Sequence, residues 1–251
     1  MRPLAVDLFC GLGGWTEGLL AEGYDVIGFD IERHVYGEHR YPAQLVIQDV
    51  LTLHGSQFKD AALIVASPPC QAYSYRAMPW KRAKALPPPD NALFEACFRI
   101  QREACEAAGR HIPLIVENVR GAQPWVGRAR WAFGSFFLWG DVPALMPVTL
   151  RAAKVPSDRG RRTDPGKGAR FTSRDCGVEA IKNPGCNLTD VGFNVASARQ
   201  FAHMVEGVKI KRSERDRRDH IGTSRKFASA MIAKIPLTLS RHIAATFRPK
   251  P

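Results

Sequence analysis

The first half of the chain alternates short apolar runs with amphipathic stretches, and this pattern limits the possible folds more than any other feature of the sequence. Amphipathic spacing predicts helices at 16–22 and 91–108. Apolar runs predict strands at 4–9, 25–29, 44–48, 62–66, 114–116 and 136–139. Strands that alternate with helices build a parallel sheet covered on both faces. We therefore expect a doubly wound α/β fold with a mostly parallel sheet.

A basic block follows this α/β pattern. Periodicity weakens after Pro147, and residues 151–226 hold 18 Lys or Arg against 9 Asp or Glu, which leaves +3 of the net charge of +12 for the rest of the chain. Such concentrated positive charge fits contact with phosphate, and a solvated charged face is the alternative. Apolar spacing returns at 227–247, with Pro236 at a helix start or kink. We expect a main domain at 1–150, a small basic lobe at 151–226 and a C-terminal segment, 227–251, that packs back on the main domain.

Composition excludes several classes of protein. No stretch approaches the roughly 18 apolar residues of a membrane span, and Asp7 and a glycine cluster interrupt the apolar N-terminal run, unlike a signal peptide. The six cysteines show no CxxC spacing, so we expect reduced thiols and no metal site. These features predict a cytoplasmic protein without membrane contact.

Glycines and acids follow the first strands in an order that favours an adenosyl cofactor. Gly11, Gly13 and Gly14 lie between a predicted strand and helix, where backbone can approach a ligand, although tight packing alone would also explain them. Asp30 ends the next strand, where it can accept from ribose hydroxyls. Asp49 follows the third strand and can accept from an adenine amino group.

The next two strands end in a cysteine turn and an acid–amide pair. Pro68 and Pro69 precede Cys70 after the fourth strand, so the thiol is expected at a rigid turn at the same sheet edge as the glycines. A buried structural cysteine is the usual alternative. Glu117 and Asn118 end the fifth strand at that edge, where they are expected within reach of Cys70.

These residues resemble the cytosine-5 DNA methyltransferases. Residues 7–14 (DLFCGLGG), 68–74 (PPCQAYS) and 117–119 (ENV) are similar to motifs I, IV and VI of that family, and residues 91–95 (NALFE) to its adenine-pocket motif. The resemblance implies a small phage-type or orphan member with a Rossmann-like class I methyltransferase fold and S-adenosyl-L-methionine as cofactor. The residues that it places around the cofactor are Phe9, Gly11, Gly13, Gly14, Asp30, Ile31, Asp49, Pro68 and Leu93.

The resemblance also implies a mechanism. Cys70 attacks C6 of cytosine, Glu117 stabilises the charge through N3, and C5 takes the methyl group. The target base must leave the duplex stack, and the loop at 73–90 is placed to close over it. Asn118 is expected beside these groups. The family's QxRxR motif has no full counterpart, and Arg128 or Arg130 is expected to contact the base, with a surface turn as the alternative.

Two other functions stay open at this stage. Cytosine-5 methylation of RNA uses the same motifs in some family members, and a catalytically silent nucleic-acid-binding relative is the third alternative. Residues 232–244 match the family's closing motif poorly. The expected partner is duplex DNA with a flipped cytosine, read by the basic lobe; a restriction nuclease is a candidate partner, and a monomer is expected.

Overall fold

The computed structural model describes residues 2–74, 87–146, 227, 230–231 and 233–249. The basic segment 151–226 and most of the loop at 73–90 lie outside the described residues, so the domain boundaries stay a prediction. The helices are α1 (Gly14–Ala21), α3 (Ala92–Ala108), α4 (Gln123–Val126) and α8 (Leu237–Phe247), with short 3-10 turns η1 (Val50–Thr52), η2 (Gly55–Phe58) and η4 (Arg120–Ala122). The strands are β1 (Leu4–Leu8), β2 (Asp25–Asp30), β3 (Val35–Tyr36), β4 (His39–Arg40), β5 (Gln44–Ile47), β6 (Ala61–Ala66), β7 (Leu114–Asn118), β8 (Trp131–Phe133) and β9 (Phe136–Gly140).

Seven strands form one sheet in the order β5-β2-β1-β6-β7-β9-β8. The pairs from β5 through β7 are parallel, and β9 and β8 continue the sheet as antiparallel strands. The chain runs outward from β1 to β2 and β5 on one side and from β6 to β7 on the other. The order therefore reverses between β1 and β6, the position at which doubly wound sheets bind ligands. The prediction of a mostly parallel α/β sheet is confirmed.

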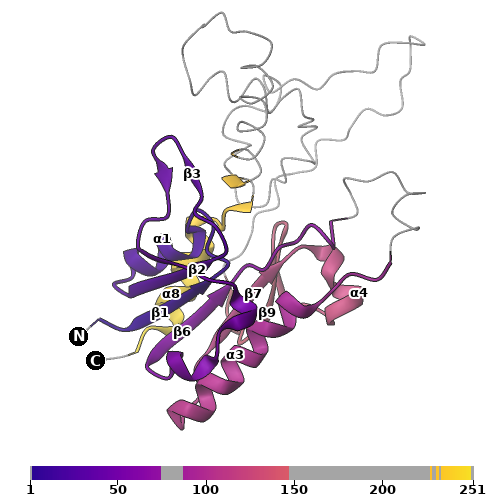
Figure 1. The fold of residues 1–251 in the computed structure, drawn as a ribbon. Coiled ribbons are helices and arrows are strands. Elements are labelled where there is room, and N and C mark those ends of the chain that lie inside the picture. The colour runs from indigo at the N-terminus through magenta and orange to yellow at the C-terminus, as the bar shows by residue number, and fades with distance from the viewer. Residues whose placement is uncertain (1, 75–86, 147–226, 228–229, 232, 250–251) are drawn as a thin grey trace, which may run out of the picture. The chain divides into compact units, whose positions relative to one another are not determined.

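Helices cover both faces of this sheet (Figure 1). α1 and α8 pack over one face, where strand residues such as Leu63, Val65 and Ile115 join Trp15 and Leu19 in a buried core. α3 packs over the other face against the alternate strand residues. Side chains alternate between the faces because successive strand residues point in opposite directions. Buried apolar runs thus explain why β1, β6 and β7 are central strands.

α8 packs against α1 although the two helices lie far apart in the sequence. Tyr24 Oη donates to the Ala244 carbonyl at 3.0 Å, across 220 positions of sequence. A Cβ built on Gly18 would lie 2.3 Å from Ser240 Oγ, so the helices approach at a distance that only glycine permits. Pro236 is the residue before α8, as the helix-start prediction implied.

Two small elements differ from the sequence-based expectations. β3 and β4 form a separate two-stranded hairpin within a stretch for which no strand was predicted. β8 adds a further strand beyond β9. β3, β4 and β8 are only two or three residues long and partly exposed, so each is too short to give a strand pattern in the sequence. Among the described residues, no helix has the length and apolar character that crossing a membrane requires.

Candidate active site

The sequence-predicted residues gather where the parallel strands end. β1 leads into the glycine turn at 9–14, and β2 ends at Asp30. β6 leads into the turn that carries Cys70, and β7 ends in Glu117 and Asn118. Carboxyl ends of neighbouring parallel strands meet at one edge of a sheet. The candidate site is therefore a row of turns along this edge, on both sides of the strand-order reversal.

The glycine turn divides into an open part and a packed part. Gly11 has φ +51° and a Cβ built on it would meet nothing within 4 Å, so this position faces open space. Gly13 has φ +78°, and its Cβ would lie 2.6 Å from Pro42 Cδ. A Cβ on Gly14 would lie 2.4 Å from the Ile235 nitrogen. Packing explains Gly13 and Gly14, whereas room for a ligand remains at Gly11. Phe9, at φ 57°, is the non-glycine residue with positive φ in the described residues.

Asp30 holds the glycine turn in place. Its Oδ2 accepts a 2.8 Å hydrogen bond from the Gly11 backbone nitrogen, and its Oδ1 lies 3.6 Å from His34 Nε2. The side chain of Asp30 is 11% exposed. A buried carboxylate that binds a loop amide fixes the loop and keeps lone pairs for another donor. His34 was missed by the sequence reasoning, because a histidine in an irregular polar stretch gives no periodic signal.

Asp7 is a second acid beneath the same turn. Thr16 Oγ1 donates to Asp7 Oδ2 at 2.6 Å, and the Tyr41 hydroxyl lies 2.7 Å from Thr16 Oγ1. Burial raises the pKa of Asp7 to about 7, opposed by the hydrogen bond from Thr16 and assisted by the nearby charge of Asp30. Asp7 Oδ1 is buried and has no hydrogen-bond partner within the described part of the chain. The network joins β1, α1 and the segment before β5.

Cys70 lies on a turn whose backbone is fixed by two hydrogen bonds. The Tyr73 nitrogen and Ser74 Oγ both donate to the Cys70 carbonyl oxygen, at 2.9 Å each. Burial raises the pKa of the Cys70 thiol above its usual range; a hydrogen bond with Ser74 lowers it, and the charge of Glu117 raises it. The thiol is only partly exposed and lies close enough to Glu117 to respond to its ionisation.

Glu117 is a buried acid at the end of β7. It is 9% exposed, and burial raises its pKa to about 8, while a hydrogen bond from Ser67 opposes the rise. At neutral pH most of this carboxyl is protonated, so it can donate a hydrogen bond. Asn118, next in sequence and buried, donates from Nδ2 to the Pro68 carbonyl at 3.0 Å. Asn118 thus ties the end of β7 to the cysteine turn.

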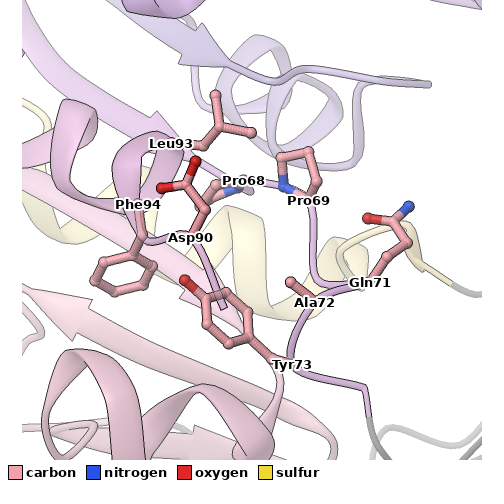
Figure 2. A pocket seen from close by; sticks show the side chains of 8 residues that line it. All are labelled: Pro68, Pro69, Gln71, Ala72, Tyr73, Asp90, Leu93 and Phe94. Carbon is pink, nitrogen blue, oxygen red and sulfur yellow. The ribbon is translucent and has the colours of Figure 1, made fainter. Parts of the chain in front are cut away.

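A pocket of about 270 Å³ opens beside the cysteine turn (Figure 2). Pro68 and Leu93, two of the expected cofactor residues, both line it. The prolines, Leu93 and Phe94 make its apolar walls, and Tyr73 reaches across to Asn91 with a 2.8 Å hydrogen bond from its hydroxyl. The complete lining is Pro68, Pro69, Gln71, Ala72, Tyr73, Asp90, Leu93 and Phe94.

Residues 4–123 match the family model of C-5 cytosine-specific DNA methylases. The match covers slightly less than half of the 251 residues of the chain. The matched range ends just after η4 and contains the glycine turn, Asp30, Cys70 and Glu117. The predicted resemblance is therefore confirmed for the methylase domain. A comparison with curated proteins finds no match to the chain.

Solved structures of methyltransferases are similar to about half of the chain. One is described as a DNA modification methyltransferase encoded within an E. coli prophage, with 23% identity, 48% of this chain and 33% of that chain covered, and a TM-score of 0.33. Another is the Dnmt2 methyltransferase of S. pombe, with 18% identity, 49% and 36% covered, and a TM-score of 0.34. A third is EhMeth of Entamoeba histolytica, with 17% identity, 50% and 41% covered, and a TM-score of 0.36. The chain thus spans about a third to two fifths of the structures that it matches.

Other predicted residues of the methylase domain lie apart from the cysteine turn. Ile31 follows Asp30 and is 71% exposed. Asp49 follows β5, and its Oδ1 accepts from the Leu51 nitrogen at 2.9 Å, so it caps η1. These two residues stand at the ends of β2 and β5, the half of the sheet edge on the far side of β1 from Cys70.

The two candidate arginines do not line the pocket beside the cysteine turn. Arg128 and Arg130 are exposed, and Arg130 lines a second pocket of about 680 Å³ together with Asp141 and His242. The backbone nitrogen of Arg130 bonds to the Leu138 carbonyl at 2.8 Å, which fixes the residue beside β9. Their role at the base stays a prediction. The described residues contain no cluster of three or more metal-ligating side chains.

Proposed function

We propose that this protein transfers a methyl group from S-adenosyl-L-methionine to C5 of cytosine in DNA, with Cys70 as the nucleophile. The observation that carries the proposal is the pairing of a cysteine turn with a buried carboxyl, whose pKa is raised by burial. Cys70 follows β6, Glu117 ends the adjacent β7, and the ionisation of one affects the other. The match of residues 4–123 to the methylase family model supports this interpretation of the pair.

Each residue type suits one step of the reaction. Cytosine C5 is a weak nucleophile until a group adds to C6, and Cys70 supplies that group as its thiol loses a proton. Addition places negative charge on the ring, and a proton held by Glu117 at N3 stabilises it. The raised pKa of Glu117, about 8, keeps that proton available at neutral pH. Asn118 holds the Pro68 carbonyl and so fixes the turn from which Cys70 acts.

The glycine turn and the pocket beside Cys70 fit an adenosyl cofactor. Gly11 leaves open space at a positive φ, and Asp30 fixes the turn while it keeps acceptor capacity for ribose hydroxyls. Leu93 and Pro68 provide apolar walls for an adenine ring. S-adenosyl-L-methionine, when bound, supplies a methyl group on an electrophilic sulfonium. In the proposal Phe9 also borders it, whereas Gly13 and Gly14 contribute through packing.

The proposed substrate is duplex DNA with the target cytosine flipped out of the stack. C6 is shielded inside a duplex, so Cys70 can reach it only after the base has left. The basic segment 151–226 is proposed to neutralise DNA phosphates. We propose a monomer that acts in the cytoplasm. A restriction nuclease is a candidate partner.

Replacing Cys70 with Ser tests the proposal. Methyl transfer from labelled cofactor should disappear, while the dissociation constant of the cofactor by calorimetry should stay within a few-fold, because the thiol is not part of the adenosyl pocket. Cys105, partly buried on α3, provides a matched control: Cys105→Ser should keep activity. Duplex DNA, single-stranded DNA and tRNA serve as parallel substrates. Full activity of Cys70→Ser would contradict the mechanism, and transfer to tRNA alone would replace DNA by RNA as the substrate.

A further inference from the structure

Trp15 and Ser67 join α1 to the turn after β6 through a partly buried hydrogen bond. Trp15 is 2% exposed, and its Nε1 donates to Ser67 Oγ at 3.0 Å. An indole nitrogen can only donate, so Ser67 Oγ is the acceptor. The hydroxyl proton of Ser67 is therefore left for a different acceptor.

Glu117 stands next to Ser67 in the neighbouring strand. The register pairs Val65 with Ile115 and Ala66 with Val116, so the next residues in line are Ser67 and Glu117. Val65 and Ile115 pack in the core beneath α1, and two residues further along each strand the side chain returns to that face. Ser67 and Glu117 thus share the face on which Trp15 lies.

Ser67 is the polar group that acts on the buried carboxyl. Its hydrogen bond lowers the pKa of Glu117 against the larger effect of burial, which raises it. From β9, the residue paired with Glu117 is the apolar Leu138. Cys70 is the titratable group that responds to Glu117, and Asp7 lies on β1, beyond β6.

We propose that Ser67, oriented by Trp15, is a positioning residue that fixes the direction of the Glu117 carboxyl. Ser67 donates to one carboxyl oxygen, and the acidic proton stays on the other oxygen, free to point at the base. The inference rests on the proposed function, in which Glu117 donates to cytosine N3. It also links the helix that follows the glycine turn to the catalytic acid, because Trp15 belongs to the first turn of α1.

The pKa of Glu117, measured without any substrate, tests the hydrogen bond itself. Carbon-13 NMR titration of the side-chain carboxyl in labelled full-length protein, assigned by its loss in Glu117→Gln, gives this pKa. A bond to the charged form lowers a carboxyl pKa, so Ser67→Ala should raise it by about 0.5 to 1 pH unit. Trp15→Phe should raise it by less, and Ser67→Thr, which keeps the hydroxyl, should keep the parent value.

Trp139 provides the matched control for the loss of an indole donor. Its Nε1 donates to the Gly127 carbonyl at 2.9 Å, and it packs in the core on the opposite face of the sheet. Trp139→Phe should leave the pKa of Glu117 unchanged. An unchanged pKa in Ser67→Ala, or equal shifts in Trp15→Phe and Trp139→Phe, would overturn the proposed contact.

Methyl transfer tests whether the contact serves catalysis. Ser67→Ala should lower kcat several-fold without changing the KM of the cofactor. It should also shift the basic limb of the pH–rate profile to higher pH. Ser67→Thr should recover the parent profile. An unchanged kcat and profile in Ser67→Ala would overturn the positioning role. If the parent protein methylates no nucleic acid, the proposed function fails, while the NMR titration still decides the hydrogen bond.

Discussion

Replacing Glu117 with Gln is expected to stabilise the protein near neutral pH while it removes methyl transfer. Burial raises the pKa of Glu117 from 4.5 to about 8. Between these two pH values the folded protein holds a proton that the unfolded chain has released. The free energy of unfolding therefore falls as pH rises through this window, since stability falls wherever the folded state binds more protons.

The magnitude follows from proton linkage. One proton held only by the folded state lowers the free energy of unfolding by about 1.4 kcal/mol for each pH unit of increase. The rise from pH 5 to pH 7 therefore lowers the free energy of unfolding by up to about 2.7 kcal/mol. Glutamine has nearly the shape of glutamate and cannot ionise, so Glu117→Gln escapes this loss. With relaxation of the buried site, we expect the variant to be more stable than the parent by about 1 to 3 kcal/mol at pH 7. Asp7 is present in both proteins and cancels in the comparison.

Urea unfolding at pH 5, 6, 7 and 8 measures this difference. The advantage of Glu117→Gln over the parent should be small at pH 5 and grow with pH up to about pH 8. Glu95→Gln, at an exposed position in the first turn of α3, is the control and should follow the parent. A constant difference between Glu117→Gln and the parent at every pH would refute the reasoning, because the carboxyl would then not be buried in protonated form.

Two further substitutions probe the glycine turn. Asp30→Ala removes the acceptor of the Gly11 amide and should weaken cofactor binding by about 1 to 3 kcal/mol in calorimetry, and an unchanged dissociation constant would make Asp30 an ordinary strand-end acid. Gly14→Ala places a Cβ 2.4 Å from the Ile235 nitrogen and should lower the free energy of unfolding in urea by about 1 to 3 kcal/mol. Stability equal to the parent would show that residue 235 does not pack against the start of α1.

Much of the fold could be predicted because its central strands are buried. β6 is apolar throughout, and β1 and β7 are apolar apart from Asp7 and the terminal Glu117 and Asn118; such runs indicate strands without help from tertiary structure. The β3–β4 hairpin has no comparable signal, because its residues are partly exposed and polar ones predominate around it. Helix α1 begins at Gly14, two residues before the predicted start, because Gly13 in the left-handed conformation ends the turn there.

Part of the candidate site could be predicted because its residues follow strands that the sequence reveals. Cys70 and Glu117 each follow a recognisable strand, and adjacent parallel strands bring their ends together. The sequence could not show which glycines serve packing, since Gly14 meets a segment more than two hundred residues away. The bond between Trp15 and Ser67 was missed for a similar reason, because no local pattern connects a helix to a later strand.

The packing of α8 on α1 has a consequence for the order in which this protein folds. The ribosome makes α8 after residues 1–236, so Trp15, Leu19 and Tyr24 emerge long before the helix that covers them. Domains tend to fold from the N-terminus during synthesis, and apolar surface left uncovered in that time favours aggregation. The part of this face that α8 covers is therefore expected to stay exposed, or to be covered by other molecules such as chaperones, until α8 has been made.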